Sequence, residues 1–256
     1  MKPSYRTPFE GLILRDGQTK GSNPPLRYFW HRWTRSEMEP LPVFTSASHP
    51  LEIAFLSRAG LPDENGPIGY CMLPGRHKAK KAHRWARDLS MDIAAIRQDR
   101  LCLVTLCTSA ELARDSPRFQ ARIESEFACQ EHHPITDKRR PGDARAFDAL
   151  VARLVDRIER EDMRVVVHCN GGNGRSALVT AAVLIGLSDM SAGTAVACVR
   201  AARPGSLRNP FQILFLWSFA WRWRSASKPP TPKPSDMFLS KRASDSYVRC
   251  LASNTS

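Results

Sequence analysis

One short segment constrains this chain more than any other: residues 168–176 read His-Cys-Asn-Gly-Gly-Asn-Gly-Arg-Ser. An apolar β-branched run, 165–167, precedes the segment, and a helix-like stretch, 177–187, follows it. The pattern therefore predicts a strand, a tight glycine-rich loop and a helix N-terminus that meet around one cysteine and one arginine.

The composition of this loop is typical of a phosphate-binding site. A helix N-terminus supplies backbone N–H groups and the positive end of the helix dipole. Glycines permit the backbone conformations that an anion-binding nest requires. The planar guanidinium of Arg175 could grip two phosphate oxygens at once. The residues expected to bind phosphate are Asn170, Gly171, Gly172, Asn173, Gly174 and Arg175.

Cys169 stands at the base of the loop, where the same N–H groups and helix dipole favour a thiolate. A thiolate there could attack phosphorus and form a phosphocysteine intermediate. Ser176 is placed to hydrogen-bond the sulfur as it leaves, and His168 is expected to organise the loop rather than act as a base. An isolated cysteine is more often a buried small hydrophobic residue. The glycines and the Arg-Ser pair that follow favour a catalytic site instead.

A second polar segment, 132–142, lies between two helical stretches and is bracketed by prolines. Phosphate monoester hydrolysis needs an acid that protonates the leaving oxygen, and Asp137 is the predicted general acid, then the general base. Asp137 as a simple turn residue is the alternative, and Asp143 is a rival acid at an expected helix N-cap. His132 and His133 lack the spacing of metal ligands, so no metal and no cofactor are expected.

Together these motifs resemble the dual-specificity branch of the cysteine-dependent protein phosphatases, and within it the cyclin-dependent-kinase-associated phosphatases. The resemblance extends from about residue 68 to residue 224 and includes the 168–176 loop and a Pro-Ile-Thr-Asp motif at 134–137. It implies that Cys169 is the nucleophile, Arg175 the phosphate binder and Asp137 the acid. It also implies a protein-tyrosine-phosphatase-like fold and hydrolysis of phosphotyrosine and phosphoserine or phosphothreonine in proteins.

The chain departs from this family at two places beside the expected site. Relatives often carry Gly-Gly after the acid, where this chain has Lys-Arg-Arg at 138–140, so the rim of the pocket is more cationic. Asn173 replaces a residue that is commonly apolar. Gln212 matches a family glutamine near the pocket, and positioning of water is its expected role.

Alternating strand-like and helix-like segments predict an α/β fold, a mainly parallel central sheet with helices on both faces. The expected organisation is an irregular N-terminal arm over 1–45, a catalytic domain over 46–224 and a flexible Pro/Ser/Lys-rich tail over 225–256. Residues 80–98 are predicted to be helical, and the basic cluster at 76–84 to be a solvated helix face or a docking site. Trp217 and Trp221 are predicted to pack in the core, because they are four residues apart on one helix.

The chain of 256 residues has a formal net charge of +13, which favours anionic partners. A phosphorylated protein is the expected substrate, with a kinase as one candidate, whereas no nucleic-acid-binding motif accompanies the charge. Irregular cysteine spacing and the lack of a long apolar run favour a reduced, cytoplasmic protein without a transmembrane segment. A phosphoinositide or RNA 5′-phosphate substrate and an inactive phosphoprotein-binding scaffold are the alternative functions. The oligomeric state is not predicted.

Overall fold

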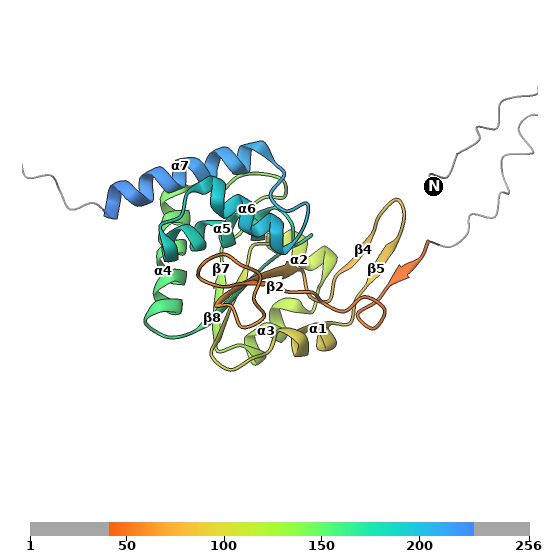
Figure 1. Cartoon of the computed structure of the whole chain (residues 1–256). Helices are drawn as coiled ribbons and strands as arrows, with labels where there is room; N and C mark the ends of the chain where they lie inside the picture. The colour runs from red at the N-terminus through yellow and green to blue at the C-terminus, as the bar shows by residue number, and fades with distance from the viewer. Residues whose placement is uncertain (1–40, 228–256) are drawn as a thin grey trace, which may run out of the picture. The chain divides into compact units, whose positions relative to one another are not determined.

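The computed structural model describes residues 41–227 (Figure 1). The arm expected over 1–45 and the tail expected over 225–256 fall almost entirely outside these residues. The strands are β1 Val43–Phe44, β2 Ala54–Leu56, β3 Ile68–Met72, β4 His77–Ala79, β5 Arg84–Ala86, β6 Leu101–Thr105, β7 Cys129–His132 and β8 Arg164–Cys169. The helices are α1 Leu89–Ile96, α2 Ser109–Asp115, α3 Phe119–Glu126, α4 Ala144–Glu159, α5 Arg175–Ser188, α6 Ala192–Ala202 and α7 Pro210–Ser227.

A five-stranded sheet with the order β2-β3-β8-β6-β7 forms the centre of the described chain. All neighbours in it are parallel except β2, which pairs antiparallel with β3 at the edge. The predicted α/β fold with a mainly parallel sheet is therefore confirmed. Ligands of such sheets bind beyond the carboxyl ends of the strands, and Cys169 is the last residue of the central strand β8.

Helices cover both faces of this sheet, as predicted (Figure 1). Side chains alternate along a strand, so Val165 and Val167 of β8 join one core while Val166 joins the other. The first core is built with α4, α5, α6 and α7, and the second with α1, α2 and α3. The loop that follows β8 is thus held between two packed layers.

Residues 80–98 do not form the single helix that the sequence predicts. β4 and β5 form an antiparallel hairpin, and β1 pairs with β5. Asp88 caps α1 by accepting a hydrogen bond from the Met91 N–H at 2.8 Å, so the helix begins only after Asp88. Trp85 of β5 packs edge-on against the rings of Phe44 and His83, which gives the hairpin its own small aromatic cluster. The solvated helix face expected over 76–84 is therefore wrong, and strand β7 was not predicted.

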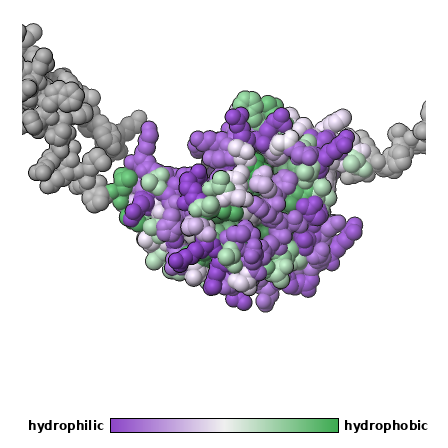
Figure 2. All heavy atoms as spheres, turned by 180° about the vertical axis from the view of Figure 1, so that it is seen from behind, coloured by the Kyte–Doolittle hydropathy of each residue, from purple (hydrophilic) through white to green (hydrophobic). Residues whose placement is uncertain are grey.

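The prediction for two tryptophans of α7 is also wrong. Trp217 and Trp221 are 59 % and 71 % exposed, because α7 turns Phe215 and Phe219 toward the core instead. Figure 2 shows a largely hydrophilic face on which a hydrophobic group stands out at the top, where α7 lies. No helix within residues 41–227 is both long and apolar enough to cross a bilayer.

Candidate active site

The 168–176 loop connects β8 to α5, as its sequence predicts, and wraps around the sulfur of Cys169. The Gly172 N–H donates a hydrogen bond to Cys169 Sγ at 3.3 Å. The Ser176 hydroxyl lies 3.3 Å from the same sulfur. Cys169 is 2 % exposed and the first turn of α5 begins at Arg175, so the helix N-terminus faces the site. The sulfur therefore lies against a backbone N–H, a hydroxyl group and a helix N-terminus.

Gly172 has a φ of +72°, the left-handed region that residues with a side chain resist. A Cβ added there would lie 2.6 Å from the Met72 nitrogen, because the loop crosses closely over the end of β3. Arg203 secures the outer side by donating to the Gly172 carbonyl at 3.0 Å. At Gly171, by contrast, an added Cβ would meet no atom within 4 Å. The loop therefore requires glycine at one of these two neighbouring positions.

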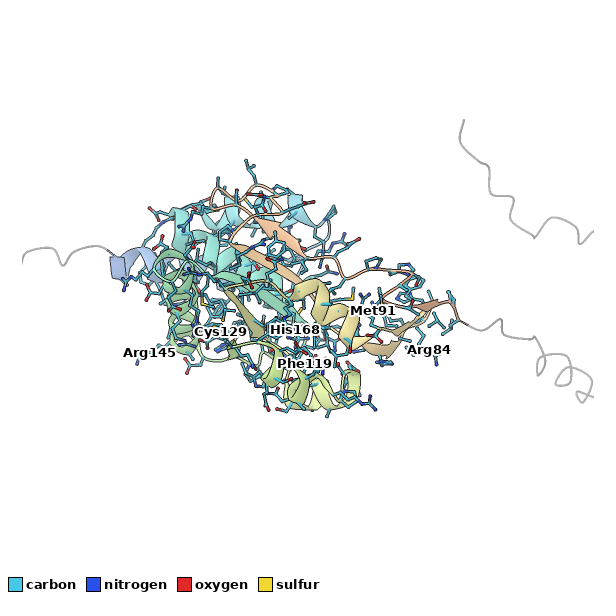
Figure 3. The ribbon with its side chains drawn as sticks, turned by 90° about the horizontal axis from the view of Figure 1, so that it is seen from below. Arg84, Met91, Phe119, Cys129, Arg145 and His168 are labelled. Carbon is cyan, nitrogen blue, oxygen red and sulfur yellow. The ribbon has the colours of Figure 1, made fainter. Side chains whose placement is uncertain are left out.

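His168, in β8, is fully buried and lies beside Phe119 (Figure 3). Its Nε2 is 2.8 Å from the Thr105 hydroxyl, and its ring meets Phe119 edge-on at 4.9 Å. Burial, with smaller contributions from the charges of His132 and Arg175, lowers the pKa of His168 to about 3. A ring that stays neutral and makes contacts away from the sulfur suits an organiser of the loop.

The Asn170 side chain does not face the anion position, although its backbone belongs to the loop. Its amide donates to the Asp115 carboxylate at the end of α2. That carboxylate also accepts from Lys78 at 3.2 Å and from Arg114 at 2.8 and 2.9 Å. Burial alone would raise the pKa of Asp115, but these donors outweigh it and hold the pKa well below its usual range. The charged Asp115 thus anchors the start of the loop.

Arg175 is held by a carboxylate that the sequence did not identify as part of the site. Both oxygens of Glu111 accept from the guanidinium, at 2.7 and 2.8 Å. Glu111 also completes the capping box of α2 with Thr108, three residues before it. Burial raises the pKa of Glu111, yet the hydrogen bonds from Arg175 and Thr108 outweigh this and lower it. A charged Glu111 therefore fixes the plane of the arginine fork.

The loop that carries Asp137 reaches the same guanidinium. Arg175 donates to the Ile135 carbonyl at 2.7 Å and to the Asp137 carboxylate at 3.0 Å. Ile135 itself is fixed to the sheet, since its N–H donates to the Leu106 carbonyl at 3.1 Å. The Asp137 side chain is 54 % exposed and lies at the mouth of the site. Asp143, the rival acid, is engaged as the N-cap of α4.

Cys169, Arg175, Asp137 and Gln212 line one hollow of about 250 Å³. Gln212, on α7, donates from Nε2 to the Arg139 carbonyl at 2.9 Å. Its Oε1 is buried without a partner among the described residues and lies 3.2 Å from the position of a Cβ at Gly174. The remaining lining residues are Lys138, Gly171, Asn173, Gly174, Gly205, Arg208 and Asn209.

The chemistry that this hollow can support is the binding of a compact anion next to a nucleophile. It presents cations from Lys138, Arg175 and Arg208 and backbone from the glycine-rich loop. Within residues 41–227, no three His, Cys, Asp or Glu side chains cluster as a metal ion would require. The residues that gather here would therefore hold an anion such as a phosphate group.

The fold, a matching family model and similar solved structures define the chain as a phosphatase of the protein-tyrosine and dual-specificity class. The members of this class are cysteine-dependent hydrolases. Residues 23–196 match the model of the family described as cyclin-dependent kinase inhibitor 3 (CDKN3), well over half of the chain. The chain belongs to this family, and the resemblance found in its sequence is confirmed.

Individual relatives are distant. Human cyclin-dependent kinase inhibitor 3 is 27 % identical over 77 % of this chain and 90 % of its own length. A zebrafish (Danio rerio) protein tyrosine phosphatase domain-containing protein 1 is 34 % identical, but the match covers 32 % of this chain and 12 % of the relative. A crystal structure of a kinase-associated phosphatase with its catalytic-site cysteine changed to serine is similar with a TM-score of 0.58 and 26 % identity. That match covers 70 % of this chain and 98 % of the other.

Proposed function

We propose that this protein hydrolyses phosphotyrosine and phosphoserine or phosphothreonine in proteins through a phosphocysteine intermediate on Cys169. The observation that carries the proposal is the single hollow lined by Cys169, Arg175 and Asp137. Three segments far apart in sequence supply these side chains, and they are a nucleophile, an anion-binding fork and a carboxyl group. The relatives named for a tyrosine phosphatase domain and for kinase association support the same class of substrate.

In the first step, Cys169 Sγ forms a bond to phosphorus as the bond from phosphorus to the ester oxygen breaks. The leaving oxygen takes the proton of the Asp137 carboxyl group, so the product departs as a neutral alcohol or phenol. Arg175 and the N–H groups of the loop hold the non-bridging oxygens, whose charge must be neutralised throughout the transfer.

In the second step, water attacks the phosphocysteine and the bond from sulfur to phosphorus breaks. Asp137, now a carboxylate, takes a proton from that water, and inorganic phosphate and the thiolate are the products. The Ser176 hydroxyl, 3.3 Å from Sγ, would donate to the sulfur as its negative charge returns. The buried, unpartnered Oε1 of Gln212 would accept a hydrogen bond from the attacking water and orient it.

Asp137 and a bound phosphate compete for one cation. In the structure, Arg175 donates to both Glu111 and Asp137. Phosphate entering the hollow would draw the exposed Asp137 off the guanidinium, whereas the buried Glu111 keeps its position. Release from Arg175 would free the Asp137 carboxyl group to approach the leaving oxygen in the first step.

Location and partners follow from the same chemistry. The six cysteines within residues 41–227 are all free, and a thiolate nucleophile needs a reducing compartment. We therefore propose a cytoplasmic enzyme whose substrate is a phosphorylated protein, with a kinase as a candidate because of the names of its relatives.

The test is the variant Cys169→Ser, assayed with an aryl phosphate and with inorganic phosphate as ligand. Hydrolysis should disappear while phosphate still binds, because the loop and Arg175 remain. Full hydrolysis by the variant would refute the covalent mechanism. A parallel assay of phosphopeptide, phosphoinositide and 5′-phosphorylated RNA decides the substrate class, and a strong preference for lipid or RNA would refute the protein substrate. Lack of turnover by the wild-type protein would favour an inactive binding scaffold.

A further inference from the structure

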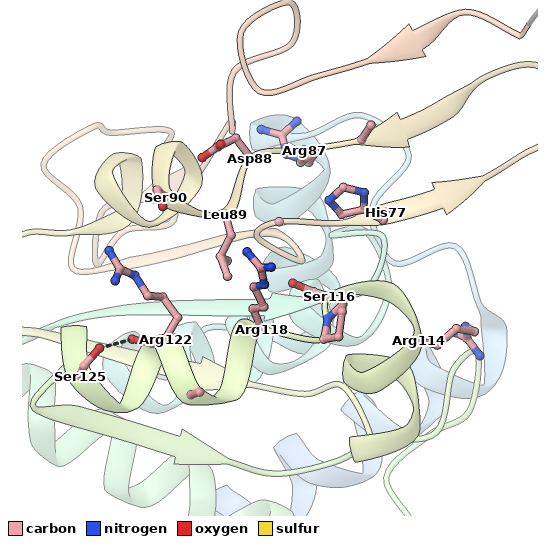
Figure 4. Close-up of a pocket in the computed structure, with 14 residues that line it drawn as sticks. His77, Arg87, Asp88, Leu89, Ser90, Arg114, Ser116, Arg118, Arg122 and Ser125 are labelled. Carbon is pink, nitrogen blue, oxygen red and sulfur yellow. Dashed lines mark hydrogen bonds between the residues drawn. The ribbon is translucent and has the colours of Figure 1, made fainter.

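A larger hollow of about 1120 Å³ lies beside the candidate active site, between the β4–β5 hairpin and α1 on one side and α2 and α3 on the other (Figure 4). Its lining includes Leu89, Ala86, Pro117 and Ala121, which give it an apolar component. Arg118, at the start of α3, points toward Leu89, and Arg122 points from α3 toward Ser90 of α1 (Figure 4). A groove of this kind has room for an extended peptide rather than for one small group.

Arginines outnumber carboxylates among the side chains that line the groove. Four arginines line it, at 87, 114, 118 and 122, against one carboxylate, Asp88. Arg87 is neutralised by its buried ion pair with Asp92 at 2.7 Å. Arg114 pairs with Asp115 at 2.8 Å, and Arg122 pairs with Glu126 at 3.0 Å. Arg118 is exposed and makes no ion pair with any residue of 41–227, so it adds an uncompensated positive charge to the groove.

A second hollow of about 480 Å³ shares one lining residue with the groove and one with the catalytic hollow. Arg114 lines both the groove and this second hollow. Asp137 lines both the second hollow and the catalytic one. Lys78 adds a further cation there. A peptide whose phosphorylated residue reaches Cys169 could therefore continue past Asp137 and Arg114 into the groove.

We propose that the groove binds an acidic segment of the substrate protein, several residues from the phosphorylated side chain. This inference rests on the proposed function and adds the class of substrate that the enzyme prefers. Arg118 and Arg122 would read negative side chains by charge, and the apolar lining would cover the stems of those side chains. Carboxylates and a second phosphorylated residue offer the same anionic chemistry.

The experiment compares peptides that share one phosphotyrosine and carry a neighbouring block of glutamates, phosphoserines or glutamines. Each block is placed N-terminal to the phosphotyrosine in one set of peptides and C-terminal to it in another. At low salt, kcat/KM should be about tenfold higher for an anionic block than for glutamines on one of the two sides. The advantage should shrink as salt is added. The glutamate and phosphoserine arms show which source of negative charge the groove prefers.

The double variant Arg118→Glu and Arg122→Glu should remove this advantage and leave hydrolysis of a small aryl phosphate unchanged. Arg160→Glu is the matched control, because Arg160 also pairs with a carboxylate four residues away, on α4, and it should keep the advantage. Equal rates for all blocks, or an advantage that survives in the double variant, would overturn the inference. These results differ from failure of the proposed function, in which the wild-type protein hydrolyses no aryl phosphate at all.

Discussion

The guanidinium of Arg175 is held by both oxygens of Glu111, at 2.7 and 2.8 Å, and both side chains are almost completely buried. Glu111 also belongs to the capping box at the start of α2. The guanidinium of Arg175 is therefore tied to the N-terminus of that helix. The orientation of the phosphate-binding group is therefore set by a residue that does not line the catalytic hollow.

Glu111→Gln should lower kcat/KM for an aryl phosphate by about a hundredfold, because a small misplacement of a positioning group is costly. It should also lower the free energy of unfolding by about 3 kcal/mol, since the buried Arg175 loses a charged partner. Aryl phosphate kinetics, with inhibition by inorganic phosphate as a measure of anion binding, and chemical denaturation measure the two effects. Glu131→Gln is the control, as Glu131 pairs with Arg153 and Arg157 away from the site, and it should leave phosphate inhibition unchanged.

Asp137→Ala should slow turnover by about a hundredfold or more with alkyl phosphates, whose leaving oxygen needs a proton. Aryl phosphates with acidic leaving groups should be affected much less in the first step. A series of substrates with graded leaving groups measures this difference. Asp143→Ala tests the rival acid, and it should affect stability rather than the dependence on leaving group. Equal sensitivity of Asp137→Ala to all leaving groups would remove Asp137 as the acid.

Gly172→Ala should abolish phosphate binding and activity, whereas Gly171→Ala should leave both close to wild type. The first substitution forces a Cβ to within 2.6 Å of the Met72 nitrogen at a positive φ, and the second meets no atom within 4 Å. Isothermal titration with phosphate and the aryl phosphate assay measure the contrast. Equal effects of the two substitutions would mean that the loop is not held in this conformation.

Stability should fall as the pH is lowered below 6.5, in part because of His168. Its pKa is lowered from 6.5 to about 3 by burial, so the unfolded chain takes up a proton that the folded protein refuses. The contribution of His168 to the free energy of unfolding is therefore complete above pH 6.5. Below that pH it decreases by about 1.4 kcal/mol per pH unit. His168→Gln should remove this component between pH 6.5 and 5 in denaturation curves. The exposed His77→Gln should keep it, and an identical slope in all three proteins would contradict the assignment.

Local signals predicted most of the fold and the main part of the candidate site. The buried run of β8, the glycines and the helix signal around Cys169 all lie within one short segment, so their meeting point could be predicted. Glu111 could not be recognised as the partner of Arg175, because the two are 64 positions apart and no local pattern joins them.

The errors have similar physical causes. The β4–β5 hairpin is held by long-range contacts, such as that between Trp85 and Phe44, which outweigh a helix-like composition. Trp217 and Trp221 lie on one helix as predicted, but Phe215 and Phe219 occupy the face of α7 that is buried. The spacing of aromatic residues gives a helix face without showing whether that face is covered.

Rapid-quench labelling of the enzyme during turnover of a ³²P-labelled substrate tests the covalent mechanism most directly. We predict a transient phosphoryl group on the peptide that contains Cys169, formed before phosphate is released and absent in Cys169→Ser. Steady turnover without any labelled enzyme, or label on a different residue, would contradict it.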